Sequence, residues 1–253
     1  MIAAFGRTDV GRRRKINEDS FLVAPGTSLY AVCDGMGGHN AGEVASRMAI
    51  ETISAFVERS GVEKEITWPW GLDGALSFDA NRLKTAIRLA NAQVFQAADN
   101  REDLTGMGTT VVAALVSGAT MTIGSAGDSR CYMARDDRLV QLTRDDSWVS
   151  AAVGEGILNS DDVERHPLRN VITKAVGARD SIDLDVIEHR LEPGDVVLLC
   201  SDGLHGMLND HELSKLLLPP TESLEEAAAT LIDAANEAGG RDNVTVVLLR
   251  YTV

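Results

Sequence analysis

The feature that most constrains this chain is a set of acidic turns, each next to an apolar run. Their acidic residues are Asp34, Asp128, Asp202 and Asp242. Such runs are typical of buried strands, so we expect the carboxylates to lie at strand ends, where a rigid scaffold aims them into a cleft without burying bare charge in the core. Because these turns are far apart in the sequence, only a folded sandwich of strands brings them together.

Oxygen ligands from several segments indicate a site for hard cations. The chain has no calcium loop of the EF-hand type and no His/Cys cluster with zinc spacing. Carboxylates, backbone carbonyls and water favour magnesium or manganese over zinc or copper. A single Asp-Gly pair is also an ordinary turn, but four acidic turns against apolar runs favour the metal site.

Length and charge limit the fold and the partners. A chain of 253 residues with 44% hydrophobic residues can bury one large core, which predicts a single domain. The 24 Lys and Arg residues against 38 Asp and Glu give a net charge of -14. This charge argues against nucleic acid or an anionic membrane as a partner.

Cysteine usage predicts a reducing compartment. Cys33, Cys131 and Cys200 lie within or beside apolar strand-like runs, and their odd number shows no disulfide-framework spacing. The apolar start at residues 2–5 is too short for a signal-peptide core, and no stretch approaches the ~18 apolar residues of a membrane span. We therefore expect a cytoplasmic protein.

Strands and helices are predicted in blocks. Strands are expected over 2–5, 20–24, 29–33, 109–117, 120–125, 130–134, 139–142, 184–191, 196–200 and 244–251, and helices over 41–59, 80–98, 212–218 and 224–238. Without regular alternation of strand and helix, these blocks predict an α+β fold of antiparallel sheets covered by helix pairs.

Short motifs along the chain resemble those of one enzyme family, in the same order. They are RKINEDS (14–20), DGMGGHNAGE (34–43), MGTT (107–110), GDSR (127–130), HPLRNVITK (166–174), SDGL (201–204) and DNVT (242–245). This set is similar to that of the metal-dependent serine/threonine protein phosphatases, the protein phosphatase 2C family, in its bacterial form. The resemblance implies a four-layer α-β-β-α sandwich with two central antiparallel sheets and a binuclear metal centre at one end. It also implies one catalytic domain over residues 1–253, with a flap-like region at about 144–174.

The resemblance assigns metal ligands residue by residue. Asp34 resembles the ligand that bridges two Mn²⁺ or Mg²⁺ ions, and Gly35 supplies a backbone carbonyl. Asp202 and Asp242 complete the shell of the first ion.

Further acidic residues match the outer part of this centre. Glu18 and Asp19 match the acidic pair near the second ion, which they hold directly or through water. Asp128 matches the acid that, with Asp202, holds a third and weaker ion in bacterial members.

The chemistry also predicts residues that act on the substrate. A phosphomonoester is a dianion, so its hydrolysis requires cations on its oxygens and a nucleophile that is deprotonated near neutral pH; two divalent ions provide both. Arg14 fits a phosphate clamp, because a guanidinium makes two parallel hydrogen bonds to phosphate; the alternative is a solvated basic turn over residues 12–15.

His39 is a candidate general acid, and its alternative is a hydrogen-bonded structural role. Many eukaryotic members carry a histidine where this chain has Met36.

The predicted function is hydrolysis of phosphoserine and phosphothreonine in proteins by a metal-activated water, in one step and without a phosphoenzyme. The expected partners are phosphorylated proteins, including a eukaryotic-like Ser/Thr kinase and its substrates, and the expected state is a monomer.

A pseudophosphatase that regulates phosphoproteins by binding them is disfavoured, because Asp34, Asp202 and Asp242 are all retained. A two-metal phosphodiesterase acting on nucleotides is disfavoured by the lack of a basic or base-stacking signature. No cysteine has the arginine that cysteine-based phosphatases place six residues later.

The segment 61–78 between the first two predicted helices contains Trp68 and Trp70. Large aromatics are common anchors in protein interfaces. We nevertheless expect both indoles to pack back on the helix pair, because buried aromatics supply much core area.

Overall fold

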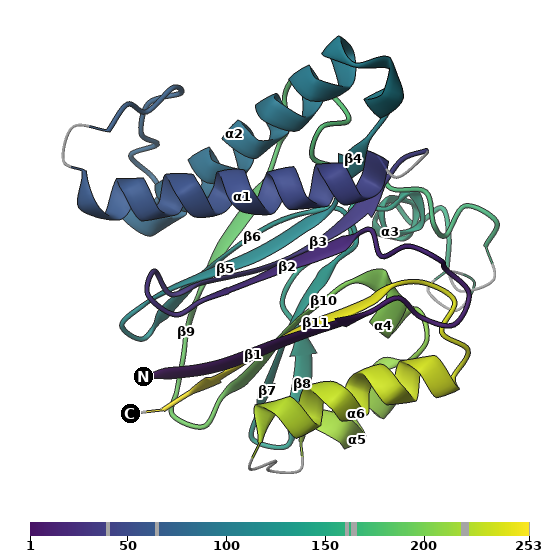
Figure 1. The fold of residues 1–253 in the computed structure, drawn as a ribbon. Coiled ribbons are helices and arrows are strands. Elements are labelled where there is room, and N and C mark those ends of the chain that lie inside the picture. Colours follow the sequence, from purple (N-terminus) through teal and green to yellow (C-terminus); the bar gives the residue numbers. More distant parts are fainter. Residues whose placement is uncertain (39–40, 64–65, 160–161, 163–165, 219–222, 253) are drawn as a thin grey trace.

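Two antiparallel sheets form the centre of the molecule (Figure 1). The computed structural model describes residues 1–38, 41–63, 66–159, 162, 166–218 and 223–252. In spatial order, sheet 1 contains β1 (Ile2–Asp9), β11 (Val244–Tyr251), β10 (Val196–Cys200), β7 (Arg130–Arg135) and β8 (Arg138–Gln141). Sheet 2 contains β2 (Asp19–Ala24), β3 (Leu29–Met36), β5 (Val111–Ser117), β6 (Thr120–Ala126) and β9 (Asp185–Arg190), and the short β4 (Gly108–Thr109) pairs with β3.

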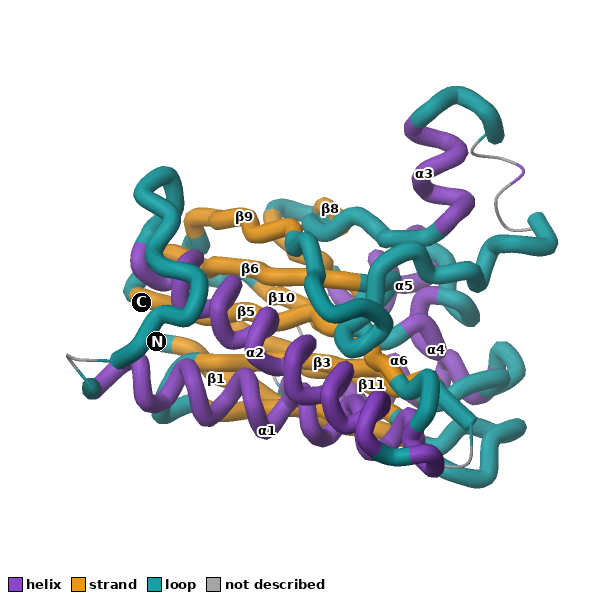
Figure 2. Tube along the Cα trace, turned by 90° about the horizontal axis from the view of Figure 1, so that it is seen from above, coloured by secondary structure: helices purple, strands orange, loops and turns teal. Residues whose placement is uncertain are grey.

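Helices cover the outer face of each sheet. The long helices α1 (Ala41–Val62) and α2 (Phe78–Asn100) lie on sheet 2, and α5 (Asp210–Leu217) and α6 (Leu224–Glu237) lie on sheet 1 (Figure 1). The shorter helices are the 3-10 turn η1 (Glu102–Leu104), α3 (Trp148–Gly154) and α4 (Asp202–His205). Seen from above, α3 projects beyond the sandwich at one end (Figure 2). The predicted α+β sandwich of four layers is confirmed. No helix in the described ranges is long and apolar enough to cross a membrane.

Apolar side chains fill the three spaces between the four layers. In β3, Leu29 and Ala31 pack beneath α1 and α2, whereas Tyr30 and Val32 face sheet 1. Successive residues of a strand point to opposite faces, so a strand that is covered on both sides is apolar at every position. This explains why the strands that carry the acidic turns have continuous apolar sequences.

Some elements differ from the sequence prediction. β1 extends to Asp9, beyond the expected end at residue 5, and pairs with β11 along its whole length. It is an edge strand, where polar residues such as Arg7 are tolerated, so hydrophobicity alone underestimates its length. The strand expected over 109–117 is divided into β4 and β5 at Thr110. The short helices α3 and α4 were not predicted, because one or two turns leave too little periodicity to detect.

Trp68 and Trp70 differ in their environment, so the expectation that both pack against the helices is correct for Trp68 and wrong for Trp70. Trp68 lies edge-on between Phe56 and Phe78, with ring centres 5.6 and 5.8 Å away, and contacts the core beneath α1. Trp70 is 50% exposed, and the guanidinium of Arg88 lies 5.9 Å from its ring centre.

This difference predicts different effects of truncating the two indoles. We expect Trp68→Ala to destabilise the protein by about 2–4 kcal/mol, because it leaves a cavity beside two aromatic rings. Trp70→Ala is the matched control and should change stability by less than about 0.5 kcal/mol. Urea unfolding curves of both variants measure this, and equal losses would contradict the assigned packing.

Candidate metal centre

Residues of both sheets meet at one end of the sandwich. In sheet 2, Asp19 at the start of β2 pairs in register with Asp34 of β3. On the sheet 1 side, Asp202 begins α4 just after β10, and Asp242 lies just before β11. The folded chain therefore brings together acidic residues that are far apart in sequence.

Asp34 is fixed through its backbone. Its N–H donates to Oγ1 of Thr110 at 2.9 Å, and its carbonyl oxygen accepts the Thr110 N–H at 2.8 Å and the Thr109 hydroxyl at 2.9 Å. Asp34 lies within β3, not after it as expected from the sequence, because the short β4 pairs with Gly35 and Met36. The carboxylate therefore projects from a hydrogen-bonded strand and not from a free turn.

Asp19 is a buried carboxylate that links the two sheets. Its Oδ2 accepts the hydroxyl of Ser201 at 2.8 Å and that of Thr245 at 2.6 Å. Its Oδ1 is buried and has no hydrogen-bond partner among the described residues. One oxygen is thus held firmly while the other keeps its lone pairs free.

The backbone around Gly35 is packed too closely to admit a side chain. A Cβ at Gly35 would overlap the carbonyl oxygen of Gly42 in α1 and lie 2.6 Å from that of Glu18. A Cβ at Gly42 would in turn overlap the Glu18 carboxylate. Glycine at both positions lets β3, the first turn of α1 and Glu18 approach one another.

Asp128 follows β6 and is positioned by its neighbours. Its carbonyl oxygen accepts a hydrogen bond from Nε2 of His205 at 2.9 Å. Burial lowers the pKa of His205 to about 4, so the ring is neutral and donates from Nε2–H. The next residue, Ser129, shares a hydrogen bond of 2.7 Å with Thr110, the residue that binds the Asp34 backbone.

Arg14 and Asp242 form the exposed side of the site. The Arg14 guanidinium lies 2.6 Å from Oδ2 of Asp242, and their side chains are 50% and 33% exposed. This pairing raises the pKa of Arg14. The side chain of Asn243, beside Asp242, accepts the Glu18 N–H at 2.8 Å and so ties this rim to the start of β2.

Burial and mutual repulsion disfavour the charged forms of the carboxylates. Desolvation, followed by the negative charges of Asp19, Asp202, Asp128 and Asp242, raises the pKa of Asp34 well above its usual value. Burial first, and then neighbouring acids, raise the pKa values of Asp19 and Asp128 to about 7. Burial and Asp242 also raise the pKa of Asp202. A cation is the natural counter-charge for such a group.

The donor set fits hard divalent cations. Oδ1 of Asp202, like Oδ1 of Asp19, is buried without a hydrogen-bond partner among the described residues, and such orphaned oxygens are rare unless they bind a group. Within that part of the chain, no three His, Cys, Asp or Glu side chains form a ready-made metal cage. Magnesium and manganese suit this arrangement, because such ions retain several waters and take few protein ligands.

The structure brings Glu18, Asp19, Asp34, Gly35, Asp128, Asp202, Asp242 and Arg14 to one end of the sandwich. His39 lies outside the described residues. Sequence reasoning missed the supporting residues Thr110, Ser201, Asn243 and Thr245. All four lie inside the motifs that carry the family resemblance, but a neutral side chain that holds an acid does not show its role in sequence.

The family-level comparison agrees with this geometry. The family model described as protein phosphatase 2C matches residues 10–242. The chain belongs to the protein phosphatase 2C family. It is 36% identical to the serine/threonine phosphatase stp of Listeria welshimeri, over 96% of this chain and 93% of that protein. It is also 37% identical to the serine/threonine protein phosphatase PstP of Mycobacterium tuberculosis, over 96% of this chain and 43% of that protein.

Solved structures show the same fold. The Mycobacterium tuberculosis phosphatase PstP/Ppp superposes with a TM-score of 0.87 at 34% identity, covering 100% of this chain and 99% of that one. The catalytic domain of PstP in complex with two manganese ions has a TM-score of 0.84 at 32% identity, covering 100% and 99% of the two chains. This protein is accordingly a metal-dependent protein-serine/threonine phosphatase.

The raised pKa values predict how the metal-free protein responds to pH. Asp19 and Asp128 have pKa values of about 7 when folded, against 3.8 as the ordinary value. Between these values the folded chain holds protons that the unfolded chain has lost, so stability should fall as pH rises through this range. Melting temperatures in chelator at about pH 5.5 and pH 8 measure this effect. Asp128→Asn should have a flatter pH dependence, and a wild-type stability that rises over the same range would contradict the cluster.

Proposed function

We propose that this phosphatase holds two divalent cations through Asp34, Asp202, Asp242 and the carbonyl oxygen of Gly35, with Asp34 as the bridging ligand. Glu18 and Asp19 hold the second cation directly or through water. The observation that supports this assignment is the buried Oδ1 of Asp202, which lacks a hydrogen-bond partner among the described residues, in a cluster where Asp202 also repels Asp34 and Asp242 repels Asp202.

The chain's own residues bind the phosphate group and limit which side chains could attack it. The half-exposed guanidinium of Arg14 offers parallel N–H donors to two oxygens of the phosphate dianion. When bound, the two cations supply charge neutralisation for the phosphate and a water that is deprotonated near neutral pH. Burial raises the pKa of Cys200 to about 12, and those of Cys33 and Cys131 also rise. None of these thiols is a competent nucleophile, which argues against a phosphocysteine intermediate.

The identity and number of the ions extend the proposal. Manganese and magnesium both suit an all-oxygen donor set, and the manganese ions of the PstP structure support manganese here. We assign a third and weaker ion to Asp128 and Asp202. The repulsion that Asp202 exerts on Asp128 supports this assignment.

The partners and setting are inferred from the activity. Phosphoproteins are the substrates of a protein phosphatase, and we propose that they include a bacterial Ser/Thr kinase and its targets. The three cysteines are free and buried, which supports a cytoplasmic location. We further propose a monomer with one catalytic domain over residues 1–253, with a flap-like region at about 144–174, of which residues 160–161 and 163–165 lie outside the described part of the chain. His39 stays a candidate general acid.

Removal of a proposed ligand tests the metal assignment. We expect Asp202→Ala to lower phosphate release from a phosphothreonine peptide by several orders of magnitude in manganese, because one cation loses a ligand. Asp233→Ala removes an exposed carboxylate from α6 and should retain wild-type turnover. Circular dichroism checks the fold of each variant. Near-wild-type turnover in Asp202→Ala would refute the proposed centre.

The third ion is tested separately through Asp128. We expect Asp128→Ala to keep two tightly bound manganese ions and to lose most of its turnover on the same peptide. Calorimetric titration counts the ions, and turnover measured against manganese concentration shows the shift in metal dependence. Loss of all manganese binding would show that Asp128 belongs to the main centre instead.

A further inference from the structure

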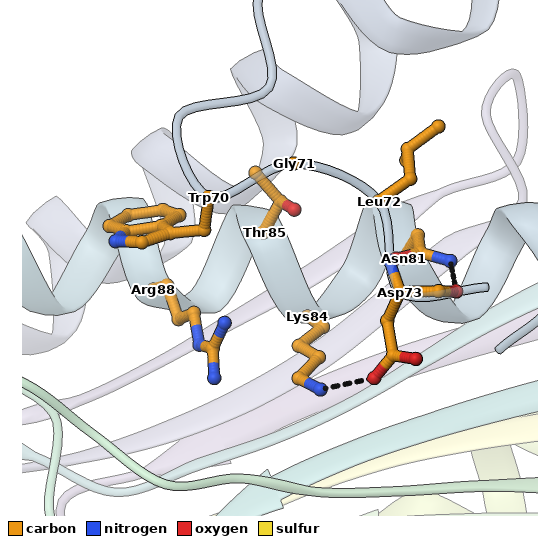
Figure 3. Close-up of a pocket in the computed structure, with 8 residues that line it drawn as sticks. All are labelled: Trp70, Gly71, Leu72, Asp73, Asn81, Lys84, Thr85 and Arg88. Carbon is orange, nitrogen blue, oxygen red and sulfur yellow. Dashed lines mark hydrogen bonds and ion pairs between the residues drawn. The ribbon is translucent and has the colours of Figure 1, made fainter. Parts of the chain in front are cut away.

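A second pocket lies far from the metal centre, between α2 and the loop that joins α1 to α2 (Figure 3). Its volume is about 290 Å³, and its principal lining residues are Trp70, Leu72, Asp73, Lys84 and Arg88. In Figure 3 the loop crosses over α2, and the charged ends of Lys84 and Arg88 project from the helix in the same direction.

Residues 68–77 of this loop are tied to α2 and to the core. The side chain of Asn81 is buried, donates from Nδ2 to the carbonyl oxygens of Asp73, Leu76 and Ser77, and accepts the Asp73 N–H at 2.8 Å. Trp68 anchors the preceding turn in the core. The exposed ring of Trp70 therefore belongs to a preformed surface, which lowers the entropy cost of binding.

Cationic and aromatic side chains line the pocket. Lys84 lies 3.3 Å from Asp73, whereas Arg88 forms no ion pair within 4 Å among the described residues, although the charge of Asp73 also acts on it, and its guanidinium lies 5.9 Å from the Trp70 ring centre. A guanidinium held beside an aromatic ring keeps its in-plane N–H donors available for a carboxylate. Trp70 is 50% exposed and provides apolar contact near the Arg88 guanidinium, whereas the exposed side chain of Leu72 points away from both (Figure 3).

We propose that this pocket is a docking site for an acidic peptide segment of a protein partner, with a carboxylate on Arg88 and an apolar side chain on Trp70. Charge complementarity supports this occupant, because the lining has two cations and one carboxylate in a chain of net charge -14. A nucleic acid requires a longer basic stripe and would be repelled by the rest of the surface.

The position of the pocket defines how it serves the enzyme. α1 has 22 residues and is therefore about 33 Å long. The first turn of α1 contacts Gly35 and Glu18 at the metal centre. The loop that joins α1 to α2 follows the opposite end of α1 (Figure 1). An extended segment of about ten residues spans the length of α1. Recruitment of phosphoproteins through this pocket rests on the proposed function, whereas binding of the peptide does not.

Equilibrium binding tests the docking site directly. The probe is a fluorescein-labelled peptide of repeating Glu-Glu-Leu, titrated with the full chain and followed by anisotropy. We expect saturable binding that weakens with salt and that falls at least tenfold in both Arg88→Gln and Trp70→Ala. Arg138→Gln removes an exposed cation on β8 and should bind as wild type does. Unchanged affinity in Arg88→Gln, or equal binding of an uncharged Gln-Gln-Leu peptide or of an oligo-dT strand, would overturn the proposal.

A kinetic experiment separates binding of the acidic segment from phosphate release. Asp202→Ala should bind the Glu-Glu-Leu peptide as tightly as wild type, so failure of the metal assignment leaves this test intact. A phosphothreonine peptide joined to the acidic segment by a flexible spacer should have a lower KM than the same peptide without it, at equal kcat. Arg88→Gln should abolish the difference. A KM advantage that persists in Arg88→Gln would refute recruitment through this pocket.

Discussion

The hydrogen bonds of Asp19 join the two sheets at the end of the sandwich where the acidic residues meet. Asp19 belongs to β2 of sheet 2, and its donors Ser201 and Thr245 belong to the sheet 1 side. Charge-assisted hydrogen bonds of this kind are stronger than neutral ones. They partly offset the cost of a buried carboxylate and fix the spacing between Asp34 on one sheet and Asp202 beside the other.

The apolar layers make this arrangement rigid enough to tolerate repulsion. Strands buried on both faces present Asp34 and Asp202 from a close-packed scaffold, which cannot relax to separate the charges. The carboxylates consequently have raised pKa values and unpaired oxygens. Such a site is destabilising by itself and becomes favourable when cations bind. Activity and metal affinity therefore have the same structural origin.

The sequence predicted much of this architecture for physical reasons. Continuous apolar strands and the acidic turns beside them are strong local signals, and the ordered motifs identified the family. Features that depend on tertiary contact were not predictable. Thr110 splits a strand to hold Asp34, and Trp70 stays exposed although Trp68, two residues away, packs in the core. The burial of two side chains so close in sequence can be told apart only from the path of the folded backbone.

The most direct test of this account is a crystal grown with manganese and measured at a wavelength where manganese scatters anomalously. We expect two strong anomalous peaks on either side of the Asp34 carboxylate, with Asp202 and Asp242 ligating one ion and the Gly35 carbonyl contributing to the centre. Peaks away from Asp34, or a single peak that Asp202 does not contact, would contradict the claim that this cluster is built for a pair of cations.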